Sequence, residues 1–165
     1  MTFGLYVHYP YCQRVCPYCD FCVASNRAPQ NEAYTEALSR EMQVRAGRFA
    51  DFGELTTVYI GGGTPSLWPV DLLERWLNKV RTHFQLSKDV EVTLELNPED
   101  ANLDHLKAIR DMGVNRLSIG AQSLDDDVLR RLGRSHRKND VIRCVELVRT
   151  AGFTNWNVDL IHGLV

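Results

Sequence analysis

Four of the five cysteines of this 165-residue chain lie within eleven consecutive residues. Cys12, Cys16 and Cys19 have the spacing C-x-x-x-C-x-x-C, and Cys22 follows three residues later. Thiolates this close together in one loop converge on a single small object. Three of them could hold three irons of a [4Fe-4S] cluster and leave the fourth iron open to bind a substrate. The spacing therefore predicts a cluster with one open iron.

Two other uses of the cysteines have to be compared with the cluster. With Cys22 included, four thiols could close a structural zinc site, and this alternative stays open at this stage. A disulfide framework is less favoured, because the N-terminus does not have the pattern of a signal peptide and Cys144 lies far away within a helical pattern. On the cysteines alone we favour the cluster over zinc.

A run of glycines is the second stretch that could do chemistry. Gly61-Gly62-Gly63-Thr64-Pro65 follows a predicted strand over residues 57–60. Glycines after a strand commonly serve only a tight turn. Three consecutive residues without Cβ also let the polar groups of a ligand approach the backbone of Gly62 and Gly63. We expect this approach to occur beside the open iron.

The composition excludes several classes of protein. A hydrophobic content of 44% and a charged content of 24% are typical of a globular domain with one core. A net charge of -2 gives no basic surface for nucleic acid. No apolar run approaches the roughly 20 residues that a transmembrane helix needs. Five retained cysteines suit a reducing compartment, so the expected location is the cytoplasm.

The elements that position these residues alternate between strand and helix. Alternating or continuous apolar runs predict strands over residues 3–9, 57–60, 90–96, 116–120 and 156–161. Between the strands, helical periodicity predicts five helices. The first covers residues 32–47 and is capped by Asn31, and the second carries the apolar stripe Leu72, Trp76, Val80 and Phe84. The third runs from a cap at Asn102 to Gly113, and the last two cover residues 125–132 and 141–151. Successive βα units predict an α/β fold, a parallel sheet with right-handed crossovers in one domain.

One face of the predicted sheet is polar. The polar side alternates with the apolar side and carries Tyr6 and His8, then Glu91, Thr93 and Glu95, then Ser118 leading to Gln122, and finally Asn157 and Asp159. In a closing barrel, side chains at the C-terminal ends of the strands line the active site, and Glu95, Gln122 and Asp159 are at such ends. For any single one of them, a cap or a loop hydrogen bond is the plainer interpretation.

The remaining histidines and the fifth cysteine are not expected to bind ligands. His83, His105 and His136 have the positions of surface or helix-flank residues. Cys144 lies on an apolar helical stripe and is interpreted as a small core residue.

Six motifs in order resemble the radical S-adenosylmethionine (SAM) proteins, and within them the oxygen-independent coproporphyrinogen III oxidase-like family, which includes the HemW-like haem chaperones. The motifs run from Leu-Tyr-Val-His-Tyr-Pro-Tyr-Cys through Gly-Gly-Gly-Thr-Pro-Ser, Glu-Leu-Asn-Pro, Leu-Ser-Ile-Gly-Ala-Gln-Ser and Gly-Arg to Asn-Val-Asp-Leu-Ile-His-Gly-Leu. The resemblance implies an incomplete (β/α) barrel of about five units with outer helices. It also implies a [4Fe-4S] cluster on Cys12, Cys16 and Cys19, with SAM bound at the open iron.

The same resemblance implies a role for each candidate residue of the SAM pocket. Tyr6 would lie beside the cluster and SAM, and Tyr18 by the adenine. Gly62, Gly63 and Thr64 would hold the methionine end. Glu95 and Gln122 would hold the ribose hydroxyls, Arg134 would pair with the SAM carboxylate, and Asp159 would complete the pocket. An electron from the cluster would then cleave SAM inside a barrel that excludes water.

Two departures decide which branch the chain resembles. The oxidases carry a long segment before the cluster motif and a further cysteine two residues after its third, whereas here the motif starts at residue 12 and that position is Phe21. Both favour the haem-chaperone branch, with haem as a further ligand and haem-accepting proteins as partners. A porphyrinogen oxidase is the alternative, so enzymatic activity stays open. A zinc-stabilised domain without redox chemistry is the second alternative.

The end of the chain departs from the family as well. Where the family continues with a proline into more βα units, this chain has Gly163-Leu164-Val165. A complete eight-unit barrel needs about 250 residues. We therefore expect residues 1–165 to be the N-terminal part of a radical SAM core, without its C-terminal barrel units and C-terminal domain.

Overall fold

The computed structural model describes residues 2–25, 29–49 and 52–163. Its strands are β1 (Thr2–Tyr9), β2 (Tyr11–Cys12), β3 (Ala24–Ser25), β4 (Glu54–Gly62), β5 (Leu86–Leu96), β6 (Arg116–Gln122) and β7 (Trp156–Leu160). Its α-helices are α1 (Asn31–Ala46), α2 (Val70–His83), α3 (Leu103–Asp111), α4 (Asp126–Arg131) and α5 (Lys138–Thr150), and the short 3₁₀ turns are η2 (Pro65–Leu67) and η3 (Pro98–Asp100).

The main sheet has five strands in the order β1-β4-β5-β6-β7, and each neighbouring pair is parallel. Each long strand is therefore added beside the one that precedes it in the chain, which is the order of a barrel wall. The predicted α/β fold with a parallel sheet is confirmed. β1 and β7 are the outer strands of this order, so the sheet in the described residues is open, as expected for an incomplete barrel.

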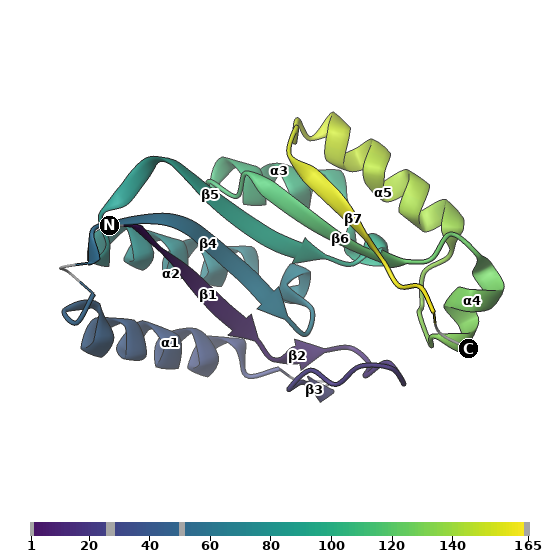
Figure 1. The fold of residues 1–165 in the computed structure, drawn as a ribbon, viewed down its shortest axis with the longest axis horizontal. Helices are drawn as coiled ribbons and strands as arrows, with labels where there is room; N and C mark the ends of the chain where they lie inside the picture. Colours follow the sequence, from purple (N-terminus) through teal and green to yellow (C-terminus); the bar gives the residue numbers. More distant parts are fainter. Residues whose placement is uncertain (1, 26–28, 50–51, 164–165) are drawn as a thin grey trace.

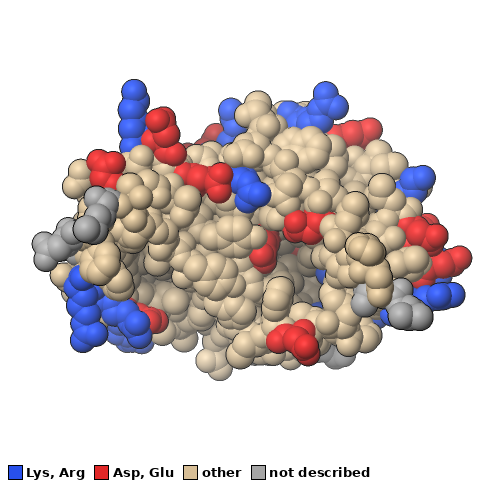
Figure 2. All heavy atoms as spheres, viewed as in Figure 1, with Lys and Arg blue, Asp and Glu red and all other residues tan. Residues whose placement is uncertain are grey.

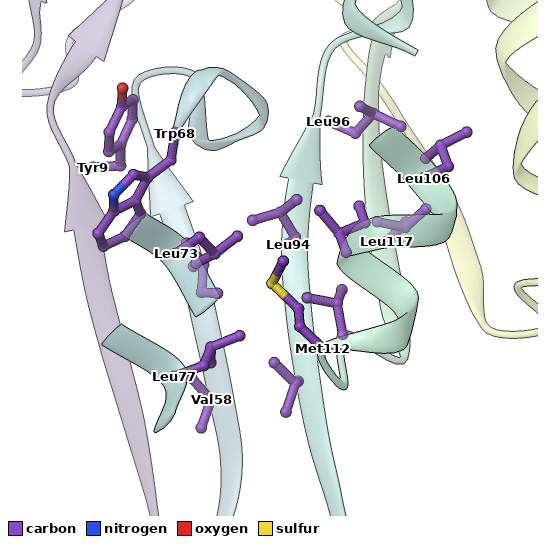
Figure 3. Packing of buried hydrophobic residues seen from close by; sticks show 14 of the residues in the cluster. Tyr9, Val58, Trp68, Leu73, Leu77, Leu94, Leu96, Leu106, Met112 and Leu117 are labelled. Carbon is purple, nitrogen blue, oxygen red and sulfur yellow. The ribbon is translucent and has the colours of Figure 1, made fainter. Parts of the chain in front are cut away.

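The helices lie on one side of this sheet, and the other side faces the viewer in Figure 1. The apolar core fills the space between sheet and helices, where Leu94 and Leu117 meet the side chains of α2 and α3 (Figure 3). Five residues of α2 are buried, namely Leu72, Leu73, Trp76, Leu77 and Val80. Full burial of a large apolar side chain stabilises a fold by about 1.5–3 kcal/mol. The helices therefore cover one face of the sheet and leave its opposite face free for polar side chains.

The start of α1 differs from the prediction. Asn31 does not cap this helix; it is the first helical residue, and Gln30 takes the N-cap position without a side-chain hydrogen bond. The Asn31 Oδ1 atom instead accepts a hydrogen bond from the buried Tyr9 hydroxyl at 2.7 Å. A tertiary partner at the end of β1 has thus replaced the local capping contact. By contrast, Asn102 caps α3 as predicted, with its side chain accepting from the N–H of His105.

Within the described residues, the search for a helix with the length and apolarity to cross a membrane finds none.

Candidate cofactor pocket at the carboxyl ends of the strands

A cavity of about 550 Å³ opens at the carboxyl ends of β4, β5, β6 and β7, beneath the cysteine loop. In Figure 2, acidic side chains border a hollow near the middle of the face that is viewed in Figure 1. The cavity is lined by residues from every segment that the sequence singled out: Cys12, Cys16, Cys19, Tyr18, Gly62, Gly63, Thr64, Glu95, Gln122, Arg134 and Asp159.

Tyr6 stands apart from this group. It is 56% exposed and does not occur among the described residues that line the cavity. Its ring stacks on Tyr59 with centroids 6.0 Å apart, and its hydroxyl lies 3.1 Å from His8 Nδ1. The place of Tyr6 beside a cofactor therefore stays a prediction.

The cysteine loop is closed at its base by a two-residue parallel pairing of β2 with β3. The N–H of Ala24 also donates to the carbonyl of Pro10 at 2.7 Å, and the N–H of Cys19 to the carbonyl of Cys16 at 3.0 Å. These contacts fold residues 10–25 into a compact loop. Cys12 is buried, Cys16 and Cys19 are half-buried, and Cys22 is exposed.

The glycine run continues the pairing of β4 with the start of the cysteine loop. The N–H of Gly63 donates to the carbonyl of Tyr9 at 2.7 Å, and the N–H of Thr64 to that of Tyr11 at 2.9 Å. A Cβ on Gly63 would lie 2.7 Å from Tyr11 O and 2.9 Å from Cys12 Sγ. Only glycine permits this approach, so the run sets the position of the first cysteine.

Glu95 projects from the end of β5 into the cavity. Its Oε1 accepts from the Tyr59 hydroxyl at 2.9 Å, and its Oε2 from the N–H of Gly62 at 3.0 Å. Burial raises the pKa of the Glu95 carboxyl, and these two hydrogen bonds act in the opposite direction. Each oxygen of an ionised carboxylate has a second lone pair, which leaves Glu95 able to accept from ligand hydroxyls.

Asp159 on β7 is oriented by two neighbours on the same face. Its Oδ2 accepts from the Ser118 hydroxyl at 2.8 Å, and its Oδ1 from the Asn157 amide at 2.7 Å. The polar face predicted from the strands is therefore a hydrogen-bonded network that ends in the cavity.

Arg134, in the segment between α4 and α5, reaches across the cavity. Its Nη2 donates to Asn97 Oδ1 at 2.6 Å and to the carbonyl of Gly120 at 3.0 Å, and its Nη1 lies 3.8 Å from Cys16 Sγ. Its Nε is buried without a hydrogen-bond partner among the described residues. A buried donor of this kind is expected to be satisfied by a bound group.

The same segment packs against the cysteine loop. Gly133 has φ +69°, and a Cβ there would lie 2.8 Å from Pro17 Cδ. Tyr18, in the same part of the cysteine loop, lines the cavity, and burial raises the pKa of its hydroxyl to about 12.

Gln122 sits in a strained turn at the end of β6. Its φ of +66° makes it the one non-glycine residue with positive φ in the described part of the chain. The N–H of Ser123 donates to the carbonyl of Ala121 at 2.8 Å, which closes a three-residue γ-turn around Gln122. Such a backbone costs on the order of 1–3 kcal/mol and is typical of functional sites.

His136 is the residue that sequence analysis missed. It is 1% exposed, so it does not lie on the surface, although it does flank a helix, since the next residue, Arg137, is the N-cap of α5. Its Nδ1 lies 3.1 Å from Glu99 Oε2 and its Nε2 2.9 Å from the carbonyl of Ala121. The sequence signal that could have found it is its spacing of two residues from Arg134. Cys144 is fully buried in the core, as predicted.

The donor set fits an iron–sulfur cluster and a zwitterionic ligand. No group of three or more His, Cys, Asp or Glu side chains in residues 2–25, 29–49 and 52–163 is close enough to hold a single metal ion. The cavity instead combines three thiols on one loop, a backbone cradle that a Cβ would fill, and a buried guanidinium with a free donor. Thiolates are the ligands of iron–sulfur clusters, and an arginine is suited to a carboxylate.

Comparison with known proteins gives the relationship. The profile of the Radical SAM superfamily matches residues 6–164. The chain is 36% identical over 162 residues to the haem chaperone HemW of Bacillus subtilis (strain 168), covering 96% of this chain and 42% of that protein. It is 37% identical over 163 residues to HemW of Escherichia coli (strain K12), covering 98% and 43%. It is 33% identical over 163 residues to the oxygen-independent coproporphyrinogen III oxidase of Salmonella typhimurium (strain LT2), covering 98% and 35%.

The solved structures agree. The coproporphyrinogen III oxidase HemN from Escherichia coli, described as a radical SAM enzyme, superposes with a TM-score of 0.89 at 33% identity, covering 98% of this chain and 37% of that one. The archaeal Elp3 of Methanocaldococcus infernus shares only the fold, with a TM-score of 0.65 at 15% identity. The chain spans less than half the length of the relatives cited here. A zinc-stabilised domain is not supported by these matches.

Proposed function

The chain belongs to the radical SAM superfamily, and on this premise we propose that it binds a [4Fe-4S] cluster and SAM in the cavity and acts as a haem chaperone. Membership of the superfamily implies SAM and the cluster. Haem, and its delivery to haem proteins in the cytoplasm, is the finer part of the proposal. It is supported by the HemW relatives at 35–37% identity.

The observation that carries the SAM part is the convergence of three thiols, the glycine run and Arg134 on one cavity. Cys12, Cys16 and Cys19 would hold the cluster. When bound, the cluster would supply the electron that cleaves SAM reductively.

The chain's own residues would bind and orient SAM. Gly62, Gly63 and Thr64 would hold the methionine end against the backbone. Arg134 would use its free Nε–H for the carboxylate, because its Nη2 is already bound to Asn97 and Gly120. These contacts leave the ribose and the adenine to be held from the other walls of the cavity.

The remaining roles follow from position around the cavity. Glu95 and Gln122 would accept from or donate to the ribose hydroxyls. Tyr18 would flank the adenine, Asp159 would complete the wall, and Tyr6 would lie beside the cluster. Thr93 and Ser118, on the same face of the sheet, are buried polar residues that help to exclude water there.

A porphyrinogen oxidase is the second candidate function. It is supported by the superposition on HemN with a TM-score of 0.89. Phe21 lines the cavity and is 64% exposed at the position where the oxidases have a cysteine, which favours the chaperone.

Anaerobic reconstitution followed by calorimetric titration with SAM tests the pocket. Arg134→Ala and Glu95→Ala should keep the iron and sulfide content of the wild type. Each should weaken SAM binding by about 1.5–3 kcal/mol, because each removes a hydrogen bond that involves a charged group. Arg75→Ala is the control. Arg75 lies on the exposed face of α2, where it forms an ion pair with Glu32 of α1. Unchanged SAM affinity in both pocket variants would place SAM elsewhere.

The haem-chaperone and porphyrinogen-oxidase activities can be distinguished with the same reconstituted protein. A chaperone should bind haem, which is followed by its absorbance, and should pass it to an apo-haem protein. An oxidase should decarboxylate coproporphyrinogen III in the presence of SAM. Decarboxylation without haem transfer would overturn the chaperone assignment.

A further inference from the structure

We propose that His136 is a positioning residue that joins Glu99 to the carbonyl of Ala121 and thereby holds both Gln122 and Arg134 in the geometry of the SAM pocket. The inference rests on the proposed function, and it assigns to the pocket a pair of residues that act by holding other residues of the pocket in place.

Both ring nitrogens of His136 face oxygens that can only accept hydrogen bonds. Nε2 lies 2.9 Å from the backbone carbonyl of Ala121, and Nδ1 lies 3.1 Å from Glu99 Oε2. The Glu99 oxygen is an acceptor because the carboxyl is ionised. Burial alone would raise the pKa of Glu99, but hydrogen bonds from His136 and Ser135 outweigh it and hold this pKa at about 2. Both contacts form together only when both nitrogens of His136 carry a proton.

We call the two contacts of the His136 ring, with the Ala121 carbonyl and with Glu99, the latch. Its contact with Ala121 stabilises a strained turn. The carbonyl of Ala121 closes the γ-turn around Gln122, where φ is +66°. The fully buried His136 side chain also contacts the Ala121 carbonyl, through Nε2. This second contact fixes the peptide that sets the direction of Gln122. Strained backbone persists only where its surroundings enforce it. Within the described residues, His136 is the side chain bonded to this carbonyl.

The Glu99 side of the latch holds the segment that carries Arg134. Glu99 Oε1 accepts from the Ser135 hydroxyl at 2.6 Å, and Glu99 itself lines the cavity. The segment is tied further by Arg137, whose Nη1 donates to the carbonyl of Arg134 at 2.9 Å and to that of His136 at 2.8 Å. The turn after β5, the end of β6 and the segment before α5 therefore meet at His136.

The charged groups at the latch come from two elements. Glu99 and Asp100 belong to η3, and Arg134 and Arg137 belong to the segment before α5. Behind them lies Cys144 of α5, where burial, with added effects from Glu99 and Asp100, raises the thiol pKa to about 12, so this thiol stays neutral. The His136 ring is therefore held by Glu99 and Ala121 rather than by a wider ionic network.

The test uses His136→Gln, Glu99→Gln and the double variant in reconstituted protein. His136→Gln replaces the ring by one terminal amide, which cannot place donors at the positions of both Nδ1 and Nε2. Glu99→Gln removes the negative charge of the side chain but keeps its shape. Each single variant should retain its iron content and should raise the SAM dissociation constant about tenfold or more. Because the two residues form one unit, the double variant should be no more than about twofold weaker than the weaker single variant. His105→Gln is the control, since His105 is a half-buried histidine of α3 that does not line the cavity.

A direct measurement on wild-type protein does not depend on how the variants fold. Nitrogen-15 NMR of the histidine rings should show a hydrogen bond at each of the two ring nitrogens of His136. A ring nitrogen of His136 without a hydrogen bond, wild-type SAM affinity in both single variants, or additive losses in the double variant would each overturn the proposal. If Arg134→Ala and Glu95→Ala leave SAM affinity unchanged, it is the proposed SAM pocket that fails, and the NMR result still decides whether the latch exists.

Discussion

The backbone N–H of Gly62 donates to Glu95 Oε2 at 3.0 Å, so the glycine run at the end of β4 is tied to the acidic residue at the end of β5. The two strands are neighbours in the sheet, and Glu95 also accepts from Tyr59 on β4. The carboxylate is thus oriented from one side by the protein and is open on the other. Its protonation state should control how it accepts ligand hydroxyls.

We expect Tyr59→Phe to weaken SAM binding roughly two- to tenfold at neutral pH. Burial already raises the pKa of Glu95, and the Tyr59 hydrogen bond lowers it. Removing this bond raises the pKa further, so the carboxylate gains its proton at a higher pH. SAM affinity measured by calorimetry from pH 5 to 8 should therefore start to fall at a higher pH in the variant than in the wild type. Superimposable pH profiles would contradict the assignment of Glu95 to the ligand.

The cysteines should separate into two groups. Alanine at Cys12, Cys16 or Cys19 should abolish cluster assembly, because these three thiols face the cavity. Cys22→Ala should leave it largely intact, since Cys22 is exposed and is absent from the described lining of the cavity. Absorbance and iron content after reconstitution provide the measurement. Loss of the cluster in Cys22→Ala would show that a fourth thiol is required.

Cys144→Ala is the matched control for this series. The Cys144 side chain is fully buried in the core, so the change should cost about 1 kcal/mol of unfolding free energy without loss of iron.

Gly63→Ala should reduce cluster assembly strongly. The new Cβ would meet Tyr11 O at 2.7 Å and Cys12 Sγ at 2.9 Å, and the backbone oxygen cannot move without displacing the cysteine loop. Gly47→Ala is the control, because a Cβ there meets nothing within 4 Å and its φ of -59° suits any residue. Iron content should fall in the first variant and stay unchanged in the second, which should be neutral or slightly stabilised. Equal iron content in both variants would show that the close approach at Gly63 is unimportant.

Glu99 should make the fold sensitive to acid. A carboxyl whose pKa is lowered in the folded state adds stability that is complete above its unfolded pKa and is lost as the pH falls through the folded value. For Glu99 this window runs from about pH 4.5 down to about pH 2. The loss should be on the order of 3 kcal/mol at most. Denaturant unfolding at pH 5, 4 and 3 should show a smaller pH dependence in Glu99→Gln than in the wild type.

Much of this arrangement could be predicted because it depends on local patterns. The strands over 3–9, 90–96 and 116–120 are confirmed within β1, β5 and β6, since alternation between polar and apolar residues has a single structural reading. The candidates at strand ends lie around one cavity because parallel strands bring their carboxyl ends to one edge.

The features that the sequence did not predict depend on contacts between residues that are far apart in the chain. Asn31 has the residue type of a cap, but Tyr9 offered its side chain a tertiary partner 22 residues away. The burial of His136 could not be expected, because the sequence does not show that Glu99 and Ala121 would surround it. The positive φ of Gln122 could not be expected either, because nothing in the residue type requires it. In each case the decisive partner is remote in sequence.

The distance along the chain between Cys16 and Arg134, which is 118 residues, has a consequence during protein synthesis. At about 5–20 residues per second, a ribosome needs roughly 6–24 s to reach Arg134 after Cys16 has been made. In this interval the thiols of the nascent cysteine loop have neither the arginine nor the Gly133 contact on Pro17 to cover them. Oxidants and competing metals can reach the thiols before the pocket is complete. The covering of the cysteine loop by Gly133 and Arg134 is therefore complete only after the second half of the chain has folded.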